Sequence, residues 1–292
     1  MEATGSRIVE YGKEDAEFSI WDIADIHLGN MGCSKEHLKR DISRIQKDPC
    51  SMFLIGGDYM DAIFPGDPRF DPESFPDDIR VRDLTRISAL IASQLINYFH
   101  PIKDKCLGIA YGNHEHKFMT RNSEMFIHDH ICSSLNAPNM RYSGWMDIYF
   151  VHSPGIKNIQ IRHSKSRPRR HTARLRCVLH HGFSTAATAG GKINALKRLV
   201  DSLEADLVMM GHVHEQFAKS FTRLTVNENC TEIKSKITMG MITGSYLRSY
   251  LPDVTSYGEI RGYFPTTLGA TRAKYIPREK RLVVENVADG IG

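Results

Sequence analysis

Five segments of the sequence carry histidine, aspartate or asparagine directly after a run of apolar residues. They read ADIHLG, GGDYMD, YGNHEH, LHHG and GHVHE, and their chemically useful residues are Asp25, His27, Asp58, Asp61, Asn113, His114, Glu115, His180, His181, His212 and His214. Imidazole and carboxylate groups together suit divalent ions such as Mn, Fe, Co or Zn. The set contains no thiolate, which disfavours a structural zinc site of the cysteine type. One such segment alone is weak evidence, but five in order predict a metal site.

The spacing within two of the segments indicates which side chains can share a centre. In an extended backbone, side chains two residues apart point to the same face. Asp25 can therefore reach the same centre as His27, and His212 the same centre as His214. The candidate ligands are too many for one ion. They suit two ions that share a bridging carboxylate and lie about 3.5–4 Å apart.

The apolar runs before these segments have the length and composition of buried strands. They are FSIWDIA (18–24), SMFLIGG (51–57), KCLGIAYG (105–112), RCVLHHG (176–182) and DLVMMGH (206–212). Apolar residues at helical spacing predict helices between them, over residues 34–45, 84–98 and 193–203. Alternating strands and helices predict an α/β fold with partly parallel strands, and in such folds ligands bind at the carboxyl ends of the strands.

Two segments interrupt this alternation. Residues 62–79, AIFPGDPRFDPESFPDDI, are rich in proline and predict a surface insertion near the site. Residues 162–176, RHSKSRPRRHTARLR, are strongly basic and form either a solvated hairpin tip or a surface that contacts phosphates. After residue 214 the helical pattern fades. β-Branched and aromatic residues with glycine turns predict strands there, in a second sheet or at the edge of one.

The composition is that of an ordinary globular protein. The 292 residues are 41% hydrophobic and 25% charged, with a formal net charge of +4. We expect a single domain over residues 1–292, and the mild positive charge permits an anionic substrate without requiring nucleic acid. The six cysteines form no C-x-x-C pair, and the N-terminus has no signal-peptide pattern. Free thiols, a cytoplasmic location and no membrane association are therefore expected.

The order D-x-H, G-D-x-x-D, G-N-H-E, a histidine after a strand, and G-H-x-H resembles the calcineurin-like metallophosphoesterase superfamily. These motifs cover residues 25–214, and the stretch around TGSYLRSYL looks faintly like uncharacterised phage-type members. The resemblance implies an α/β fold of two mixed β-sheets packed face to face and flanked by helices, a four-layer sandwich. It also implies a phosphate-ester substrate and two divalent metal ions, with Mn expected first and Fe, Zn, Co or Ni as alternatives.

The resemblance further implies a role for each motif residue. One metal would be held by Asp25, His27, Asp58 and His214, and the second by Asp58, Asn113, His212 and one histidine of the pair at 180 and 181. A hydroxide between the ions would attack phosphorus. His114 would act as the general acid, and Asp61 would orient its ring.

His180 and His181 are neighbours, so in a strand their side chains point to opposite faces and cannot easily serve one site. We expect His180 to bind the second metal, because in HHGFS it aligns with the ligand of the superfamily's HGGLS form and lies nearer the strand end. His181 would then face the substrate mouth or make a supporting hydrogen bond. It is the alternative ligand.

The motifs resemble the protein Ser/Thr phosphatase form except at one position. Those phosphatases carry a phosphate-clamping arginine after the second aspartate of GDxxD, and here that position is Ala62. The G-H-x-H ending is the form found in phosphodiesterases and nucleases, which favours a diester substrate, including nucleic acid. The alternative is a phosphomonoesterase acting on a nucleotide, a small molecule or a phosphoprotein. A non-catalytic scaffold is disfavoured, because His114 and every ligand are present.

Four arginines are candidate substrate-binding residues. Arg248, in GSYLRSY, is a possible substitute for the missing phosphate clamp because it follows a predicted strand. The other three are Arg167, Arg169 and Arg170 of the basic segment, which would contact phosphates of a nucleic acid. The sequence does not indicate an oligomeric state.

Overall fold

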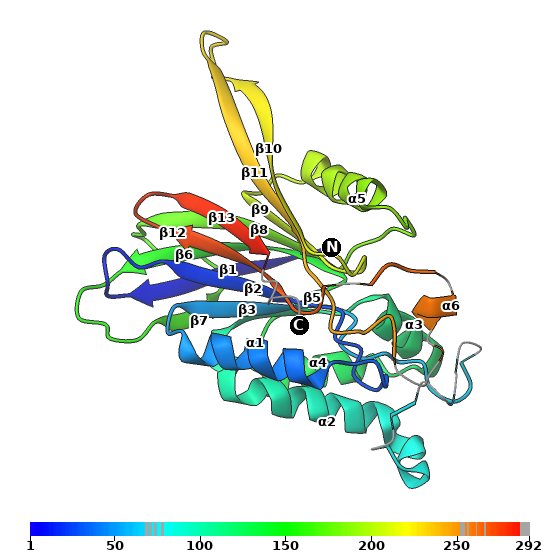
Figure 1. Ribbon diagram of the computed structural model, residues 1–292. Coiled ribbons are helices and arrows are strands. Elements are labelled where there is room, and N and C mark those ends of the chain that lie inside the picture. Colours follow the sequence, from blue (N-terminus) through cyan, green and yellow to red (C-terminus); the bar gives the residue numbers. More distant parts are fainter. Residues whose placement is uncertain are drawn as a thin grey trace.

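The computed structural model describes residues 1–67, 70, 72, 75–76, 79–251, 255, 257–260, 262–265 and 267–286. Within these ranges, two mixed β-sheets lie face to face (Figure 1). The seven-stranded sheet runs, edge to edge, β10 (Phe217–Val226), β11 (Ile233–Ile242), β9 (Leu207–Met210), β8 (Ala173–His180), β6 (Ser143–His152), β1 (Glu2–Tyr11) and β7 (Gln160–Ser164). The six-stranded sheet runs β13 (Arg281–Asn286), β12 (Thr271–Ile276), β2 (Phe18–Ile23), β3 (Ser51–Gly56), β4 (Cys106–Ala110) and β5 (Asn139–Arg141).

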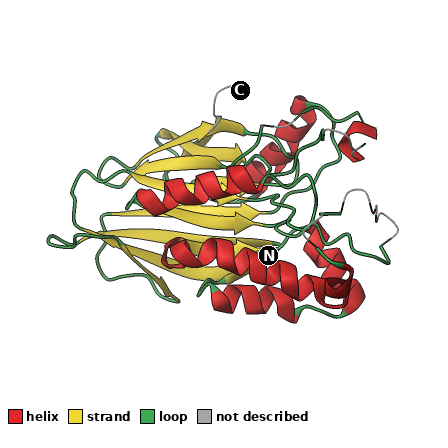
Figure 2. Ribbon diagram, turned by 60° about the horizontal axis from the view of Figure 1, so that its bottom comes forward, coloured by secondary structure: helices red, strands yellow, loops and turns green. Residues whose placement is uncertain are grey.

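Helices cover the outer faces of the two sheets (Figure 2). The six-stranded sheet carries α1 (Lys35–Lys47), α2 (Ile87–Phe99) and α4 (Phe126–Ser134), and the seven-stranded sheet carries α5 (Ala189–Ser202). The remaining helices are α3 (Asn113–Asn122), α6 (Tyr257–Ile260) and 3₁₀ turns at Val81–Arg86 and His100–Lys105. The expected α/β fold of two face-to-face sheets flanked by helices is confirmed. None of the helices in the described ranges is long and apolar enough to cross a membrane.

Alternation of side chains along the strands divides the core into three apolar clusters. In β8, Cys177 and Leu179 point between the sheets, whereas Val178 points to α5. In β2, Ile20 joins the cluster between the sheets and Trp21 joins the one under the helices. Central strands are thus buried on both faces, which is why they read as continuous apolar runs. Each such Leu, Ile or Val contributes about 1.5–3 kcal/mol by leaving water.

The five strands predicted from the apolar runs are confirmed as β2, β3, β4, β8 and β9. The first three are parallel neighbours in one sheet, and the last two are parallel neighbours in the other. Their carboxyl ends reach the same end of the molecule. The loops that follow these strands therefore meet there, although they come from two different sheets.

The sequence pattern does not indicate β1, because Gly5 and Arg7 interrupt its apolar residues. Arg7 is fully buried, and burial lowers the pKa of its guanidinium to about 10. Its Nε donates to the carbonyl of Leu107 at 2.5 Å, and its other nitrogens donate to Thr4. These hydrogen bonds make a cation tolerable in a position that patterns reserve for apolar residues.

The segments outside the motifs extend the sheets. The strands predicted after residue 214 are present, with β10–β11 projecting from one sheet (Figure 1) and β12–β13 forming the edge of the other. The basic segment 162–176 includes the end of β7 and the start of β8. Of the expected insertion 62–79, residues 68–69, 71, 73–74 and 77–78 lie outside the described residues.

A buried histidine of α4 links this helix to the loop after β3 and to the start of β5. The Nδ1 atom of His128 accepts a hydrogen bond from the Tyr59 hydroxyl at 2.9 Å, and its Nε2 donates to Asn139 Oδ1 at 2.9 Å. These partners suit the neutral ring. Burial lowers the pKa of His128 to about 4.

Stability should therefore fall as the solution is acidified from about pH 6.5 to pH 4. In this window the unfolded chain binds a proton at His128 and the folded chain does not. The loss is on the order of 3 kcal/mol and is complete near pH 4. Urea unfolding in EDTA across this range should show a shallower pH dependence in His128→Asn than in the wild type. The exposed neighbour His130 supplies the control, since His130→Asn should keep the wild-type slope. Equal slopes in all three proteins would remove this role of His128.

Candidate metal centre

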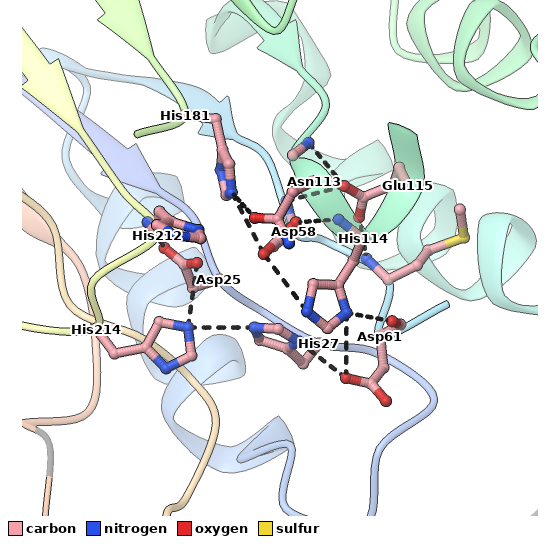
Figure 3. Close-up of polar contacts among 12 residues, drawn as sticks. Asp25, His27, Asp58, Asp61, Asn113, His114, Glu115, His181, His212 and His214 are labelled. Atoms are coloured by element: carbon pink, nitrogen blue, oxygen red, sulfur yellow. Dashed lines mark hydrogen bonds and ion pairs between the residues drawn. The ribbon is translucent and has the colours of Figure 1, made fainter. Parts of the chain in front are cut away.

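Three groups of side chains converge at the carboxyl ends of the strands (Figure 3). Within each group the potential ligand atoms all lie within 4.8 Å of one another. The groups are Asp25, His27 and His214; Asp58, His181 and His212; and His27, Asp61 and His114. Asp58 lies centrally among these side chains in Figure 3, and Asn113 lies beside it. Every motif of the sequence thus contributes to one cluster.

The backbone at these positions is left-handed rather than extended. Asp25, His27, Asp58, His212 and His214 all have φ between 47° and 72°. Such a conformation costs a residue other than glycine roughly 1–3 kcal/mol and persists only where the surrounding structure holds it. The directions of these side chains are therefore set by sharp turns and not by the alternation of an extended strand. Asp25 and His27 fall in one group, as expected from their spacing, whereas His214 joins the first group and His212 the second, which is the division that the resemblance implied.

The first group directs two imidazole nitrogens and a carboxylate oxygen toward one point. His27 Nδ1 donates to Asp61 Oδ1 at 3.0 Å, and burial lowers the pKa of His27, so its Nε2 presents a lone pair. That Nε2 lies 3.3 Å from His214 Nε2, which lies 3.2 Å from Asp25 Oδ1. Nitrogen and oxygen donors in this arrangement fit Mn, Fe, Co, Ni or Zn.

The second group surrounds His181 with oxygen atoms. Its Nδ1 donates to the carbonyl of Gly56 at 3.0 Å. Its Nε2 faces two acceptors, Asn113 Oδ1 at 3.1 Å and Asp58 Oδ2 at 3.3 Å. Burial favours the neutral ring, but the charges of Asp58 and Asp25 outweigh it and raise the pKa of His181 to about 10. The pocket therefore demands positive charge at this nitrogen, which a divalent cation between these atoms and His212 would supply.

The structure brings His181, and not the expected His180, into this group. Leu179 points between the sheets and Val178 points to α5, so by alternation His181 continues the inner face and His180 the outer one. His181 is fully buried in the cluster. His180 Nδ1 instead accepts a hydrogen bond from the amide of Gly182 at 2.9 Å. The geometry therefore favours His181, the alternative ligand, over His180.

This difference predicts opposite outcomes for two single substitutions. His181→Ala should lower the affinity for one divalent ion by tenfold or more, because it removes a ligand. His180→Ala should keep both affinities, since its ring makes no contact with the ligand atoms. Metal content after dialysis against Mn²⁺ measures both. Loss of metal from His180→Ala with retention in His181→Ala would restore the original assignment.

Asp61 contacts two histidines through different atoms. Its carboxylate accepts from His27 Nδ1 and, at 3.2 Å, from Asn30 Nδ2. Its backbone carbonyl accepts from His114 Nδ1 at 2.5 Å, while Oδ1 lies 3.7 Å from that nitrogen. Asp61 does adjoin His114, as expected, but its carboxylate orients His27 more directly. Burial favours neutral His114, yet Asp58 and Asp61 offset it and raise the pKa of His114.

Glu115 ties two motif loops together, a role that the sequence analysis did not assign. Its fully buried carboxylate accepts from the amides of Asp58 at 3.0 Å, Met60 at 2.6 Å and Gly112 at 2.7 Å. Through these bonds the start of α3 holds the loop that carries Asp58. An acidic residue three positions after a helix start is the signal that indicates such a contact.

The arginines proposed as substrate ligands are not among the clustered residues. Arg248 donates its backbone amide to the carbonyl of Gly32 at 2.9 Å, in the loop that follows His27. The basic segment leads into Ala173, at the end of β8 opposite the cluster, and an eight-residue strand spans about 23 Å. The structure therefore places Arg167, Arg169 and Arg170, in the connection before Ala173, away from the clustered side chains.

Known proteins are similar to this chain in sequence and in structure. The sequence model of the family described as Calcineurin-like phosphoesterase matches residues 18–216, a range that contains every clustered residue. Among solved structures, a conserved uncharacterised protein of Streptococcus pneumoniae TIGR4, described as a predicted phosphoesterase, is 10% identical with a TM-score of 0.32, over 92% of this chain and 99% of that one. Zinc-bound Vps29 of Entamoeba histolytica is 11% identical with a TM-score of 0.35, over 92% and 97%. No curated protein matches.

Proposed function

Because this chain belongs to the calcineurin-like phosphoesterase family, we propose that it hydrolyses a phosphate ester with two divalent metal ions. The observation that carries the proposal is the pair of ligand groups, Asp25–His27–His214 and Asp58–His181–His212, that meet at one cluster (Figure 3). Asp58 would be a ligand of both ions, and Asn113, whose Oδ1 lies 3.1 Å from His181 Nε2, would complete the second group.

When bound, two such ions activate a water molecule and neutralise charge on the phosphoryl oxygens. The protein's part is to hold the ligands and to place a proton donor. The left-handed turns fix the ligand directions, and Glu115 fixes the loop of Asp58 through its amide. Mn²⁺ is our first choice of ion, since the ligands are imidazole and oxygen without thiolate.

His114 is the proton donor for the departing alkoxide. Its Nδ1 is anchored on the carbonyl of Asp61 at 2.5 Å, so its Nε2 is the free nitrogen. That Nε2 lies 4.0 Å from Asp58 Oδ2, next to the proposed bridging oxygen atoms. A donor in this place can reach the leaving oxygen of a phosphate held by the ions.

A diester is the proposed substrate. The G-H-V-H ending supports it, and Ala62 occupies the position where monoester-cleaving protein phosphatases carry a clamping arginine. A monoester carries more negative charge than a diester and has more need of such a clamp. The basic segment no longer adds support, since it leads into the far end of β8.

The discriminating experiment compares two aryl phosphates. Metal-stripped protein with added Mn²⁺ should cleave bis(p-nitrophenyl) phosphate with a higher kcat/KM than p-nitrophenyl phosphate. The reverse preference would assign a phosphomonoesterase. Cleavage of neither compound with any divalent ion would favour a scaffold that kept the fold without the chemistry.

The proposed location is the cytoplasm. None of the six cysteines, all of which lie in the described ranges, forms a disulfide, and Cys33, Cys106, Cys132 and Cys177 are buried. Unpaired cysteines are typical of proteins in a reducing compartment.

A further inference from the structure

Residues 243–246 lie after the part of the chain that matches the family. They make hydrogen bonds to the backbone at and just before Asp25. The Oγ of Ser245 and the amide of Tyr246 both donate to the carbonyl oxygen of Asp25, each at 2.9 Å. Thr243 Oγ1 donates to the carbonyl of Asp22 at 2.6 Å, near the end of β2 and just before this loop. All these groups are buried. The carbonyl of Asp25 is therefore fixed by residues more than 200 positions later in the chain.

These contacts bear directly on the Asp25 carboxylate. Asp25 has φ of 52°, and its Oδ2 accepts from the amide of His212 at 2.8 Å while Oδ1 faces His214 Nε2 at 3.2 Å. The direction of this side chain depends on the backbone conformation at Asp25, to which its carbonyl belongs. Two hydrogen bonds to that carbonyl help to keep the left-handed conformation.

The segment is itself anchored on α1. The Tyr246 hydroxyl donates to Asp41 Oδ2 at 3.0 Å, and both side chains are fully buried. Asp41 also accepts from Arg40 Nε at 3.0 Å, Arg44 at 3.4 Å and the amide of Ala270 at 3.2 Å. A buried carboxylate with this many donors is a rigid anchor. The chain of contacts thus runs from α1 through Tyr246 to Asp25.

We propose that Asp41, Tyr246 and Ser245 are positioning residues that set the affinity of the first metal site, formed by Asp25, His27 and His214. The proposal rests on the two-metal function proposed above. Ser245 and Tyr246 lie after residue 216, where the family match ends. They would act on the metal site through the backbone carbonyl of Asp25 and not through a ligand atom.

The positioning role is tested by measuring the binding of Mn²⁺ to the metal-stripped protein. The wild type should bind two ions, and Tyr246→Phe and Ser245→Ala should each weaken one of the two about tenfold while leaving the other unchanged. Two matched controls should keep both affinities: Tyr275→Phe, in the core between the sheets, and Ser19→Ala, at the start of β2. Urea unfolding in EDTA verifies that each variant is folded.

A second background identifies which ion is weakened. In His27→Ala, which lacks the first site, Tyr246→Phe should have no further effect on the remaining ion. Unchanged affinities in folded Tyr246→Phe and Ser245→Ala overturn the positioning role, as does an equal loss at both sites, which indicates general loosening. A wild-type protein that binds no Mn²⁺ would instead overturn the proposed function, and this inference with it.

Discussion

Asp58→Asn should lower hydrolysis of a phosphate diester by on the order of 10³-fold and reduce the metal content at both sites. An amide is neutral and a weaker ligand. Asp58 belongs to the second group and is the carboxylate proposed to bind both ions, so its replacement should weaken both ions together. The several kcal/mol of charge stabilisation that such ions supply correspond to a rate loss of this size. Elemental analysis and initial rates on the same preparation measure both effects.

The control for this substitution is Asp147→Asn on β6. Asp147 pairs with Arg176 at 2.8 Å on the surface of the seven-stranded sheet and belongs to none of the three ligand groups. It should keep activity and metal. Full occupancy of both ions in Asp58→Asn would contradict the bridging role, even if activity fell.

His114→Ala is the second large effect, and its size should depend on the leaving group. An alkoxide is a poor leaving group without a proton donor, so alkyl diesters should lose about 10²–10⁴-fold in kcat. A p-nitrophenolate leaves readily without protonation, so the aryl ester should lose far less. The ratio of the two losses is the quantity to measure. His116→Ala is the matched control, since His116 lies two residues away on α3 and is exposed. Equal losses on alkyl and aryl esters would exclude His114 as the general acid.

The convergence of the motifs could be predicted because it depends on local features. Apolar runs of strand length, each ending in Asp, Asn or His, indicate both the central strands and the edge at which the ligands meet. Parallel strands place their carboxyl ends together, so Asp25, Asp58 and Asn113, which follow β2, β3 and β4, could be assigned to one site from the strand pattern. His214 follows a strand of the other sheet, and the resemblance to the superfamily is what assigned it to the same site.

The direction in which each side chain points could not be predicted in the same way. The choice between His180 and His181 depends on which face of β8 lies between the sheets. The alternation of buried Ala173 and Leu175 with less buried Arg174 and Arg176 indicates that face and leads to His181, but the apolar run at the end of the strand does not show it. The left-handed turns at Asp25 and His212 depend on hydrogen bonds from distant loops. Spacing rules for extended chains therefore do not apply there.

The sequence also did not indicate the roles of buried polar residues outside the motifs. Asp41 lies on the buried face of α1 beside Leu38, Ile42 and Ile45, at helical spacing. A carboxylate on such a face indicates a specific buried partner, but the sequence does not name it. Its partner, Tyr246, becomes visible only in the folded chain.

The two-metal centre is tested most directly by measuring how many Mn²⁺ ions must bind before the protein hydrolyses its substrate. Metal-stripped protein, titrated with Mn²⁺ and assayed on bis(p-nitrophenyl) phosphate, should be inactive at the start and reach full activity only as the second equivalent binds. Activity that survives stripping, or that is complete with one ion bound, would contradict a centre of two ions joined by Asp58.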